Sequence, residues 1–375
     1  MRILVAGRGF DSPGKHSLGI FELDQARALQ AAGHDVRFAA IDTRSIRRKR
    51  PLGRRKYDMG GVPVYYCAIP GIPKPALLAE GTQKAAAAAI WKMLARDGWL
   101  PEIVHAHFGA GFLHVAKKHG IPTVYTEHFS AANQINVPPE ELRRERETYA
   151  LADRLICVSS ALAARVTEHT GVQPRVIHNI ADTGVFSRNR AARMPKEGFH
   201  FVSAGNLIPG KGFDLLLEAF ARARAEREDI HLTVIGDGPE EPSLKALAQR
   251  LGIGESVNFT GRLFREEMSA VYRSADAFVL ASRGETFGLV YIEAMAAGLP
   301  VIATACGGPE DFVSDANGMT VPVEDIPALT EAMLRMVDTS DRFDSETIAR
   351  FAVENFSPEN TAGQITAVYK ELCPC

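Results

Sequence analysis

Short apolar runs alternate with amphipathic stretches along almost the whole chain. The runs are rich in β-branched residues and apolar on both sides, which is typical of strands in a parallel sheet that helices cover on both faces. An amphipathic stretch such as Leu18–Ala32, closed by Gly33, predicts one of these helices. In the first half of the chain the predicted strands are Ile3–Ala6, Val36–Ile41, Val62–Ile69, Ile103–His107, Thr123–Glu127, Leu155–Val158 and Val176–His178.

The alternation stops at residues 188–198, which are polar and contain proline and glycine, so we predict a linker there. The pattern indicates an α/β chain of two doubly wound, parallel-sheet (Rossmann-like) domains, 1–187 and 199–357. Because ligands of such sheets bind at the carboxyl ends of strands, we expect the domains to face a cleft. The predicted strands of the second domain are Phe201–Ala204, Leu232–Ile235, Val257–Thr260, Ala277–Ala281 and Val301–Thr304.

Composition narrows the class of protein. A length of 375 residues suits two domains, and a net charge of −2 gives no reason to expect nucleic acid as a partner. The first apolar run is too short for a signal peptide and no run could span a membrane, so we expect a cytoplasmic protein whose five cysteines are free thiols. The segment Arg44–Lys56 is basic throughout, and is either a solvated loop or a patch that meets phosphate groups.

Two glycine-rich loops approach nucleotide-binding motifs, and each fails at one position. The dinucleotide fingerprint would need a third glycine where the chain has Ser12. The loop Gly205–Gly212 matches a P-loop except at its last position, where Gly212 replaces the hydroxyl residue that would hold Mg²⁺. The patterns therefore disfavour NAD binding and ATP hydrolysis. Lys211 remains either a suitable partner for a phosphate group or an ordinary lysine in a turn.

Residues 284–295, GETFGLVYIEAM, place two carboxylates, Glu285 and Glu293, among apolar residues. A buried charge is costly unless something pairs with it. A helix beginning near Gly288 would offer its first amides to a diphosphate, and Glu293 would then accept hydrogen bonds from ribose hydroxyls. The alternative is a buried carboxylate that is tied to a neighbouring amide or arginine.

Two predicted strands of the first domain end in histidine, His107 in VHAHFG and His128 in YTEHFS. A single histidine is more often structural than catalytic. Two at adjacent strand ends, both facing the expected cleft, make a functional role as probable as a structural one.

Together these loops resemble those of retaining, nucleotide-sugar-dependent glycosyltransferases of family 4 (glycosyl transferases group 1), which have the GT-B fold. The resemblance covers nearly the whole chain. It implies that residues 358–375 form a helix that crosses back to the first domain. The segments that carry it are LQAAGHDV, VHAHFG, AGNLIPGKGFDLLLEAF, IGDGPEEPSL, NFTGRL and SRGETFGLVYIEAMAAGLPVIAT followed by GGPEDFV.

The resemblance also implies a role for each matching residue. Lys211 would hold the donor diphosphate, Glu285 the hydroxyls of the transferred sugar, and Glu293 the ribose. His128 would lie beside the anomeric carbon, with His107 on the acceptor side. The other implied donor contacts are Gly19 and the amides of Phe287, Gly288, Leu289 and Val290 near the diphosphate, and Gly236, Gly238, Arg262 and Leu263 near the nucleotide.

Two positions depart from the family pattern. Asn206 stands where the family usually has arginine, which removes one cationic diphosphate contact and leaves room for a weak enzyme. The usual Asn-Gly-Val-Asp after the last strand of the first domain is here Asn179-Ile180-Ala181-Asp182, which leaves the conformation of the interdomain hinge open.

The family reading implies retention of anomeric configuration and no metal cofactor, since the chain has no Asp-x-Asp. The donor would be a UDP-, GDP- or ADP-sugar and the acceptor a glycan or lipid-linked molecule of cell-envelope or exopolysaccharide synthesis. The basic segment Arg44–Lys56 and the predicted helix Ala76–Trp91 favour peripheral association with an anionic membrane. The alternatives are a sugar phosphorylase, a nucleotide-sugar hydrolase, or a catalytically silent sugar-nucleotide-binding or glycan-binding protein.

Overall fold

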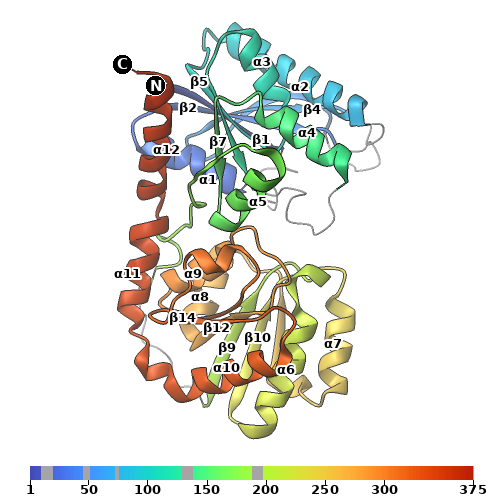
Figure 1. Cartoon of the computed structure of the whole chain (residues 1–375), viewed down its shortest axis with the longest axis vertical. Coiled ribbons are helices and arrows are strands. Elements are labelled where there is room, and N and C mark those ends of the chain that lie inside the picture. Colours follow the sequence, from blue (N-terminus) through green and yellow to red (C-terminus); the bar gives the residue numbers. More distant parts are fainter. Residues whose placement is uncertain (10–19, 45–50, 72–75, 129–137, 188–196, 375) are drawn as a thin grey trace. The chain divides into compact units, whose positions relative to one another are not determined.

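The computed structural model describes residues 1–9, 20–44, 51–71, 76–128, 138–187 and 197–374. The chain divides into two compact units, Met1–Ile180 with Pro358–Cys375, and Ala181–Ser357. Each unit is built on one sheet with helices on both of its faces (Figure 1).

The sheet of the first unit has the strand order β3-β4-β2-β1-β5-β6-β7-β8. Neighbouring strands are parallel except β3 and β4, which form an antiparallel pair at one edge. The strands are β1 (Arg2–Arg8), β2 (Asp35–Asp42), β3 (Gly53–Asp58), β4 (Pro63–Ala68), β5 (Ile103–His107), β6 (Thr123–Glu127), β7 (Arg154–Cys157) and β8 (Arg175–Val176).

Two helices from opposite ends of the chain cover one face of this sheet. The helix α12 packs beside α1 (Figure 1), and both bury apolar residues against β1 and β2, among them Leu29, Ile365 and Phe38. Burial of each such side chain contributes about 1.5–3 kcal/mol. The helices of the first unit are α1 (Ile20–Ala31), α2 (Ala76–Arg96), α3 (Gly111–Lys118), α4 (Pro139–Tyr149), α5 (Ser160–Thr170) and α12 (Pro358–Leu372).

The sheet of the second unit has the order β11-β10-β9-β12-β13-β14, with all neighbours parallel. Its strands are β9 (Phe199–Ala204), β10 (Ile230–Ile235), β11 (Val257–Gly261), β12 (Ala277–Leu280), β13 (Val301–Thr304) and β14 (Gly318–Val321). Its helices are α6 (Phe213–Glu226), α7 (Glu241–Arg250), α8 (Arg265–Ser274), α9 (Leu289–Ala296), α10 (Ile326–Thr339) and α11 (Ser345–Phe356).

Both sheets reverse their strand order at one point, between β1 and β5 in the first unit and between β9 and β12 in the second. At such a point the loops leaving two neighbouring strands run in opposite directions and open a crevice at the carboxyl ends. Each unit therefore has one place where a ligand site is expected on topology alone.

The structure corrects three expectations about the elements. The first sheet is mixed, not wholly parallel, because Gly53–Asp58, expected to be a basic loop, is the edge strand β3. Its side chains are mostly exposed, so no apolar alternation marked it, and pairing with the buried β4 holds it in place. The strand β14 was not predicted either. Residues 45–50 of the basic segment and 188–196 of the expected linker lie outside the described residues.

Two further expectations concern cysteines and membranes. Cys67, Cys157, Cys306 and Cys373 are free thiols, as expected, and Cys375 lies outside the described residues. None of the described helices is both long and apolar enough to cross a membrane.

Candidate active site

The turn after β9 in the second unit has the shape that its glycine dictates. Pro209–Lys211 form one turn of 3-10 helix, and Gly212 follows with φ 63°, a conformation in which other residues are strained. A Cβ atom at Gly212 would lie 1.9 Å from the carbonyl oxygen of Ala281. A serine or threonine here, as in a P-loop, would therefore force the backbone to move, which is a structural reason for the failed match.

This turn brings Lys211 to the carboxylate of Glu285, which follows β12. The Lys211 Nζ donates to Glu285 Oε1 at 2.6 Å, and the Ser282 hydroxyl donates to the same oxygen at 2.8 Å. The side chain of Glu285 is 7% exposed and that of Lys211 is 24% exposed. The backbone of Glu285 is held as well, since its carbonyl accepts from the amide of Gly308. Two residues 74 positions apart thus meet at the reversal point between β9 and β12.

Arg283 joins the two loops that carry this pair. It donates two hydrogen bonds to the carboxylate of Asp214 on α6, at 2.9 and 2.7 Å, and one to the carbonyl of Pro209 at 2.6 Å. Its Nε donates to Glu324 at 3.0 Å. The Arg283 guanidinium also lowers the pKa of Asp214. The turn that presents Lys211 is thereby tied to the loop that presents Glu285.

The second glutamate lies on α9. Gly288 caps this helix with φ 98°, and no described side chain caps its first amides. Glu293 is 8% exposed and, after burial, its charge contributes to the raised pKa of the Tyr272 phenol. Phe287 is buried against Phe312 and Phe356, so only its backbone is available to a ligand. The amides of Leu289 and Val290 open the helix.

The other predicted nucleotide contacts lie on turns at the same edge of the second sheet. Gly236 and Gly238 follow β10, and a Cβ at either would lie 1.9 or 2.4 Å from a carbonyl oxygen of the turn after β9. Arg262 is exposed and Leu263 half-buried, directly after β11. Asn206 is exposed, and its carbonyl accepts from the amide of Ile208. Gly19 lies outside the described residues.

In the first unit, His107 and His128 meet at the ends of β5 and β6. The His107 Nδ1 and His128 Nε2 atoms are 2.7 Å apart, and both side chains are buried. Gln25 on α1 donates to His107 Nε2 at 3.3 Å and to His105 Nδ1 at 3.0 Å. Tyr369 of α12 also bonds His105 Nδ1, at 2.6 Å.

This network determines the tautomers. Because an amide nitrogen only donates, His107 Nε2 must accept and His107 Nδ1 must carry the proton that it donates to His128. The proton of a neutral His128 then resides on its Nδ1. That atom is buried and makes no hydrogen bond of ordinary geometry to a described residue, although the side chain of Asn179 is near enough to favour protonation. In the described residues this N–H is covered by protein and faces the side chain of Asn179.

Burial keeps the histidines neutral. It lowers the pKa of His107 to about 3, with a further contribution from the charge of Arg8. It also lowers the pKa values of His105 and His128 well below the ordinary value, again with neighbouring charge as a smaller cause. At neutral pH the cluster can donate and accept hydrogen bonds, and it carries no charge.

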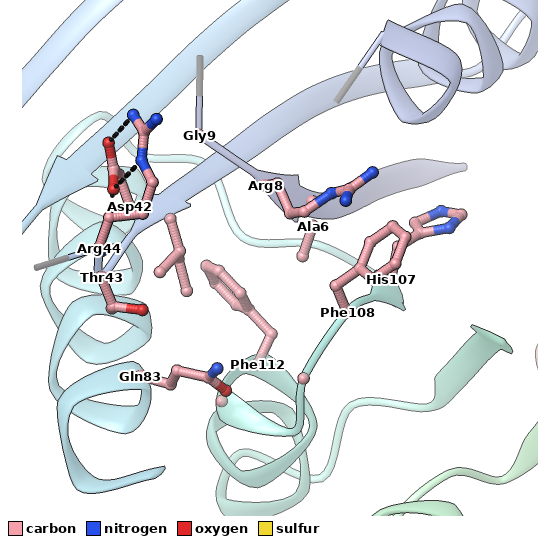
Figure 2. Close-up of a pocket in the computed structure, with 14 residues that line it drawn as sticks. Ala6, Arg8, Gly9, Asp42, Thr43, Arg44, Gln83, His107, Phe108 and Phe112 are labelled. Atoms are coloured by element: carbon pink, nitrogen blue, oxygen red, sulfur yellow. Dashed lines mark hydrogen bonds and ion pairs between the residues drawn. The ribbon is translucent and has the colours of Figure 1, made fainter. Parts of the chain in front are cut away.

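A pocket of about 250 Å³ opens beside this cluster, at the reversal point between β1 and β5 (Figure 2). Arg8 and Gly9 line it from the end of β1, and Asp42 and Arg44 from the end of β2. The two residues Asp42 and Arg44 form an ion pair at 2.6 Å. Gln83 of α2 and Phe112 of α3 close the opposite side (Figure 2).

Sequence reasoning missed several residues of these sites. His105 had a usable signal, because it alternates with His107 along β5 and so lies on the same face of the strand. Gln25, Tyr369 and Arg283 had none, since each acts through a contact with a residue distant in sequence. Among the described residues, no group of three or more histidine, cysteine, aspartate or glutamate side chains could hold a metal ion.

Two family models match adjoining segments that together span most of the chain. The model described as Glycosyltransferase Family 4 matches residues 21–185, and that described as Glycosyl transferases group 1 matches residues 187–350. The chain belongs to this glycosyltransferase family. Its two Rossmann-like sheets are those of the GT-B fold, as the sequence predicted.

Relatives and solved structures agree with this assignment. The glycosyltransferase is 28% identical to the D-inositol 3-phosphate glycosyltransferase of Acidothermus cellulolyticus, over 94% of this chain and 85% of the relative. It is 31% identical to that of Mycolicibacterium smegmatis, over 72% of this chain and 67% of the relative.

Among solved structures, sucrose-phosphate synthase from Thermosynechococcus elongatus aligns with a TM-score of 0.79 and 21% identity, over 99% of each chain. Anabaena HepE in complex with UDP-glucose aligns with a TM-score of 0.75 and 18% identity, over 99% of this chain and 100% of that one. At these identities the likeness to the solved structures concerns the fold.

Proposed function

We propose that this glycosyltransferase moves a sugar, with retention of anomeric configuration, from a nucleotide diphosphate sugar to a hydroxyl group of a glycan or lipid-linked acceptor. The observation that carries the proposal is the Lys211–Glu285 pair at the reversal point of the second sheet. The helix α9, which begins four residues after Glu285, adds its first amides and the carboxylate of Glu293. This arrangement supplies a cation, helix amides and two carboxylates, which are the groups that a diphosphate and sugar hydroxyls require.

The Lys211–Glu285 pair leaves hydrogen-bonding capacity for a donor. An ammonium has three protons, and one goes to Glu285 Oε1, so two are available to diphosphate oxygens. Lys211 and Ser282 both bond Oε1, which leaves Glu285 Oε2 to accept from hydroxyls of the transferred sugar. Glu293 would accept from the ribose.

The chemical step that we propose is electrostatic. As the bond from the anomeric carbon to the diphosphate breaks, negative charge develops on the leaving oxygen, and Lys211 with the amides of α9 stabilises it. A front-face reaction lets the diphosphate accept the acceptor's proton, so no protein nucleophile is required. His128 would lie beside the anomeric carbon, and His107 would lie on the acceptor side. We propose that no metal takes part.

The substrates follow from the relatives only as proposals. UDP-glucose occupies HepE, so we propose a UDP-, GDP- or ADP-sugar as donor. The relatives are named for D-inositol 3-phosphate, which adds a phosphorylated polyol to the acceptors to be tested. We further propose a role in cell-envelope or exopolysaccharide synthesis at the cytoplasmic face of the plasma membrane, with the exposed basic side chains of Arg54 and Arg55 on β3 contacting anionic lipid.

The test begins with a thermal-shift screen against nucleotide sugars, because a ligand of the folded state raises its melting temperature. The donor found is then incubated with acceptor, with and without EDTA, and the anomeric configuration of the product is read by NMR. We expect a retained configuration and no loss with EDTA. Glu293→Ala should raise the donor KM at least tenfold, which corresponds to about 1.4 kcal/mol. An inverted product, or a strict requirement for Mn²⁺ or Mg²⁺, would contradict the mechanism.

Asn206 favours a second candidate, a catalytically weak or silent sugar-nucleotide-binding protein, because one cationic contact is replaced by a neutral side chain. Slow hydrolysis of the donor without acceptor would argue against a catalytically silent protein. Phosphate dependence of the reaction would instead identify a phosphorylase.

A further inference from the structure

Arg8, at the carboxyl end of β1, is held in an unusual way. Its Nε lies 3.3 Å from Glu22 Oε1. Its guanidinium carbon lies 3.7 Å from the centre of the Phe108 ring and 5.5 Å from that of Phe21. Phe108 itself has φ 54°, a strained conformation for a residue other than glycine, and strain of this kind clusters at functional sites. Figure 2 shows Arg8 extended beside Phe108 and His107.

Burial of Glu22, the ion-pair partner of Arg8, costs free energy. The Glu22 side chain is completely buried, and its Oε2 makes no hydrogen bond with a described residue. Burial raises the pKa of this carboxyl, and the charge of Arg8 opposes that rise. The space exists because residue 7 is glycine, where a Cβ would lie 3.1 Å from that of Glu22 and 2.9 Å from the Phe38 ring. A buried ion pair in which one carboxylate oxygen has no partner contributes little to the stability of the fold. We therefore infer that Glu22 serves to hold the Arg8 guanidinium in place.

Glu22 occupies only one of the five donors of Arg8. The terminal nitrogens make no hydrogen bond with the described residues, while the side chain is 34% exposed. The two aromatic rings and the carboxylate fix the guanidinium plane, so little side-chain entropy remains to be lost when a ligand binds. An arginine fixed in this way offers a preorganised pair of parallel donors, the geometry that suits a phosphate or carboxylate.

Among the described residues that line the pocket beside Arg8, the one carboxylate is that of Asp42. It accepts two side-chain bonds from Arg44 and one from the Tyr66 hydroxyl at 3.2 Å, so it does not compete with a ligand for Arg8. His107 is neutral, for the reasons given above. A volume of about 250 Å³ is small for a ligand site and holds roughly one sugar or cyclitol ring.

We propose that Arg8 binds a phosphate group on the acceptor while the acceptor's ring occupies this pocket, and that Glu22 is a positioning residue for Arg8. The inference rests on the proposed function, because it treats the pocket as an acceptor site. It goes further in naming the residue that recognises the phosphate group and the pocket that holds the ring.

The test measures binding of inorganic phosphate to the full-length protein from its melting temperature at constant ionic strength. Lys211→Ala is present in every variant, so that the cation of the second unit does not contribute. Arg8→Gln, Arg8→Lys and Glu22→Gln are compared with Arg2→Gln. Arg2 is the matched control because it opens the same strand and also pairs with a glutamate, Glu102, at 3.8 Å.

We expect the affinity for phosphate to fall at least tenfold in Arg8→Gln, because a phosphate–guanidinium pair is a strong charge-assisted contact. Arg8→Lys should lose several-fold, since lysine keeps the charge and loses the parallel donors. Glu22→Gln should also weaken binding and yet melt no lower than its parent, because it removes a buried charge. Arg2→Gln should bind as the parent does. Equal affinity with and without Arg8, or no phosphate response at all, would overturn the proposal.

A second arm distinguishes a free anion from a phosphorylated acceptor. D-inositol 3-phosphate should bind more tightly than inorganic phosphate and than myo-inositol, and the advantage over myo-inositol should disappear in Arg8→Gln. Equal affinity for D-inositol 3-phosphate and inorganic phosphate would reduce the site to a simple anion site and overturn the acceptor assignment. Nucleotide-sugar turnover separates the two proposals: turnover without a phosphate response refutes this inference alone, and a phosphate response without turnover refutes the proposed function alone.

Discussion

Gly212→Ser restores the P-loop consensus and should destabilise the second unit. Position 212 has φ 63°, and left-handed backbone costs a residue with a Cβ about 1–2 kcal/mol. The new Cβ would lie 1.9 Å from the Ala281 carbonyl oxygen, so the backbone must move. Overpacking of this kind costs roughly 1–3 kcal/mol. The sum is about 2–5 kcal/mol, a large share of the stability of an ordinary domain.

Urea unfolding, read from the transition of the second unit, measures this loss. Gly210→Ser is the matched control, because the same turn has open space around Gly210 and the residue does not require a positive φ. It should change the free energy of unfolding by no more than about 0.5 kcal/mol. If Gly212→Ser were as stable as Gly210→Ser, or gained Mg²⁺-dependent ATPase activity, our account of this turn would be wrong.

Three further perturbations test other contacts. Above pH 6.5 His107 is neutral in the folded and the unfolded protein, whereas at lower pH the unfolded chain binds a proton that the folded protein does not bind until about pH 3. The contribution of His107 to the free energy of unfolding should therefore fall by about 2 kcal/mol between pH 6.5 and 4.5. His107→Asn should show a correspondingly smaller drop in urea titrations. Gln25→Ala frees the tautomer of His107 and His128 and should lower kcat/KM about tenfold with the acid sensitivity retained. Arg283→Ala removes the hydrogen bonds to Asp214 and Pro209, so it should lower the free energy of unfolding by about 1–3 kcal/mol and raise the donor KM. Arg227 is an exposed arginine with an ion pair of its own, and Arg227→Ala should lower the free energy of unfolding by less than about 1 kcal/mol.

The sequence predicted the buried strands well because burial on both faces leaves a plain signal. The predicted strands Ile103–His107 and Thr123–Glu127 coincide with β5 and β6. The strand β3 has no such signal, because an edge strand with exposed side chains is specified by the backbone of its neighbour. The pattern of apolar runs therefore identified the buried strands and the edge strands β8 and β11, and it missed the edge strands β3 and β14.

The sites were predictable in part for the same reason. His107 and His128 were placed at adjacent strand ends by counting along two strands, and the structure brings their rings together. The contact between Lys211 and Glu285 depends on the strand order β9-β12, which no local pattern contains. The sequence placed both residues on the donor side only through the family resemblance, and their roles there stay predictions.

A comparison of two arginines separates a structural role from a ligand-binding role. Each lies at the reversal point of its sheet and is tied to a carboxylate, Arg8 to Glu22 and Arg283 to Asp214. Arg283 donates hydrogen bonds from Nε and from both terminal nitrogens to protein acceptors, so few of its donors remain for a substrate. Its role is to link the two loops. Among the described residues, Arg8 bonds an acceptor through Nε, and its two terminal nitrogens bond none. This difference in donor use supports our proposal that Arg8 contacts the acceptor, whereas the bonds of Arg283 hold two loops of the second unit together.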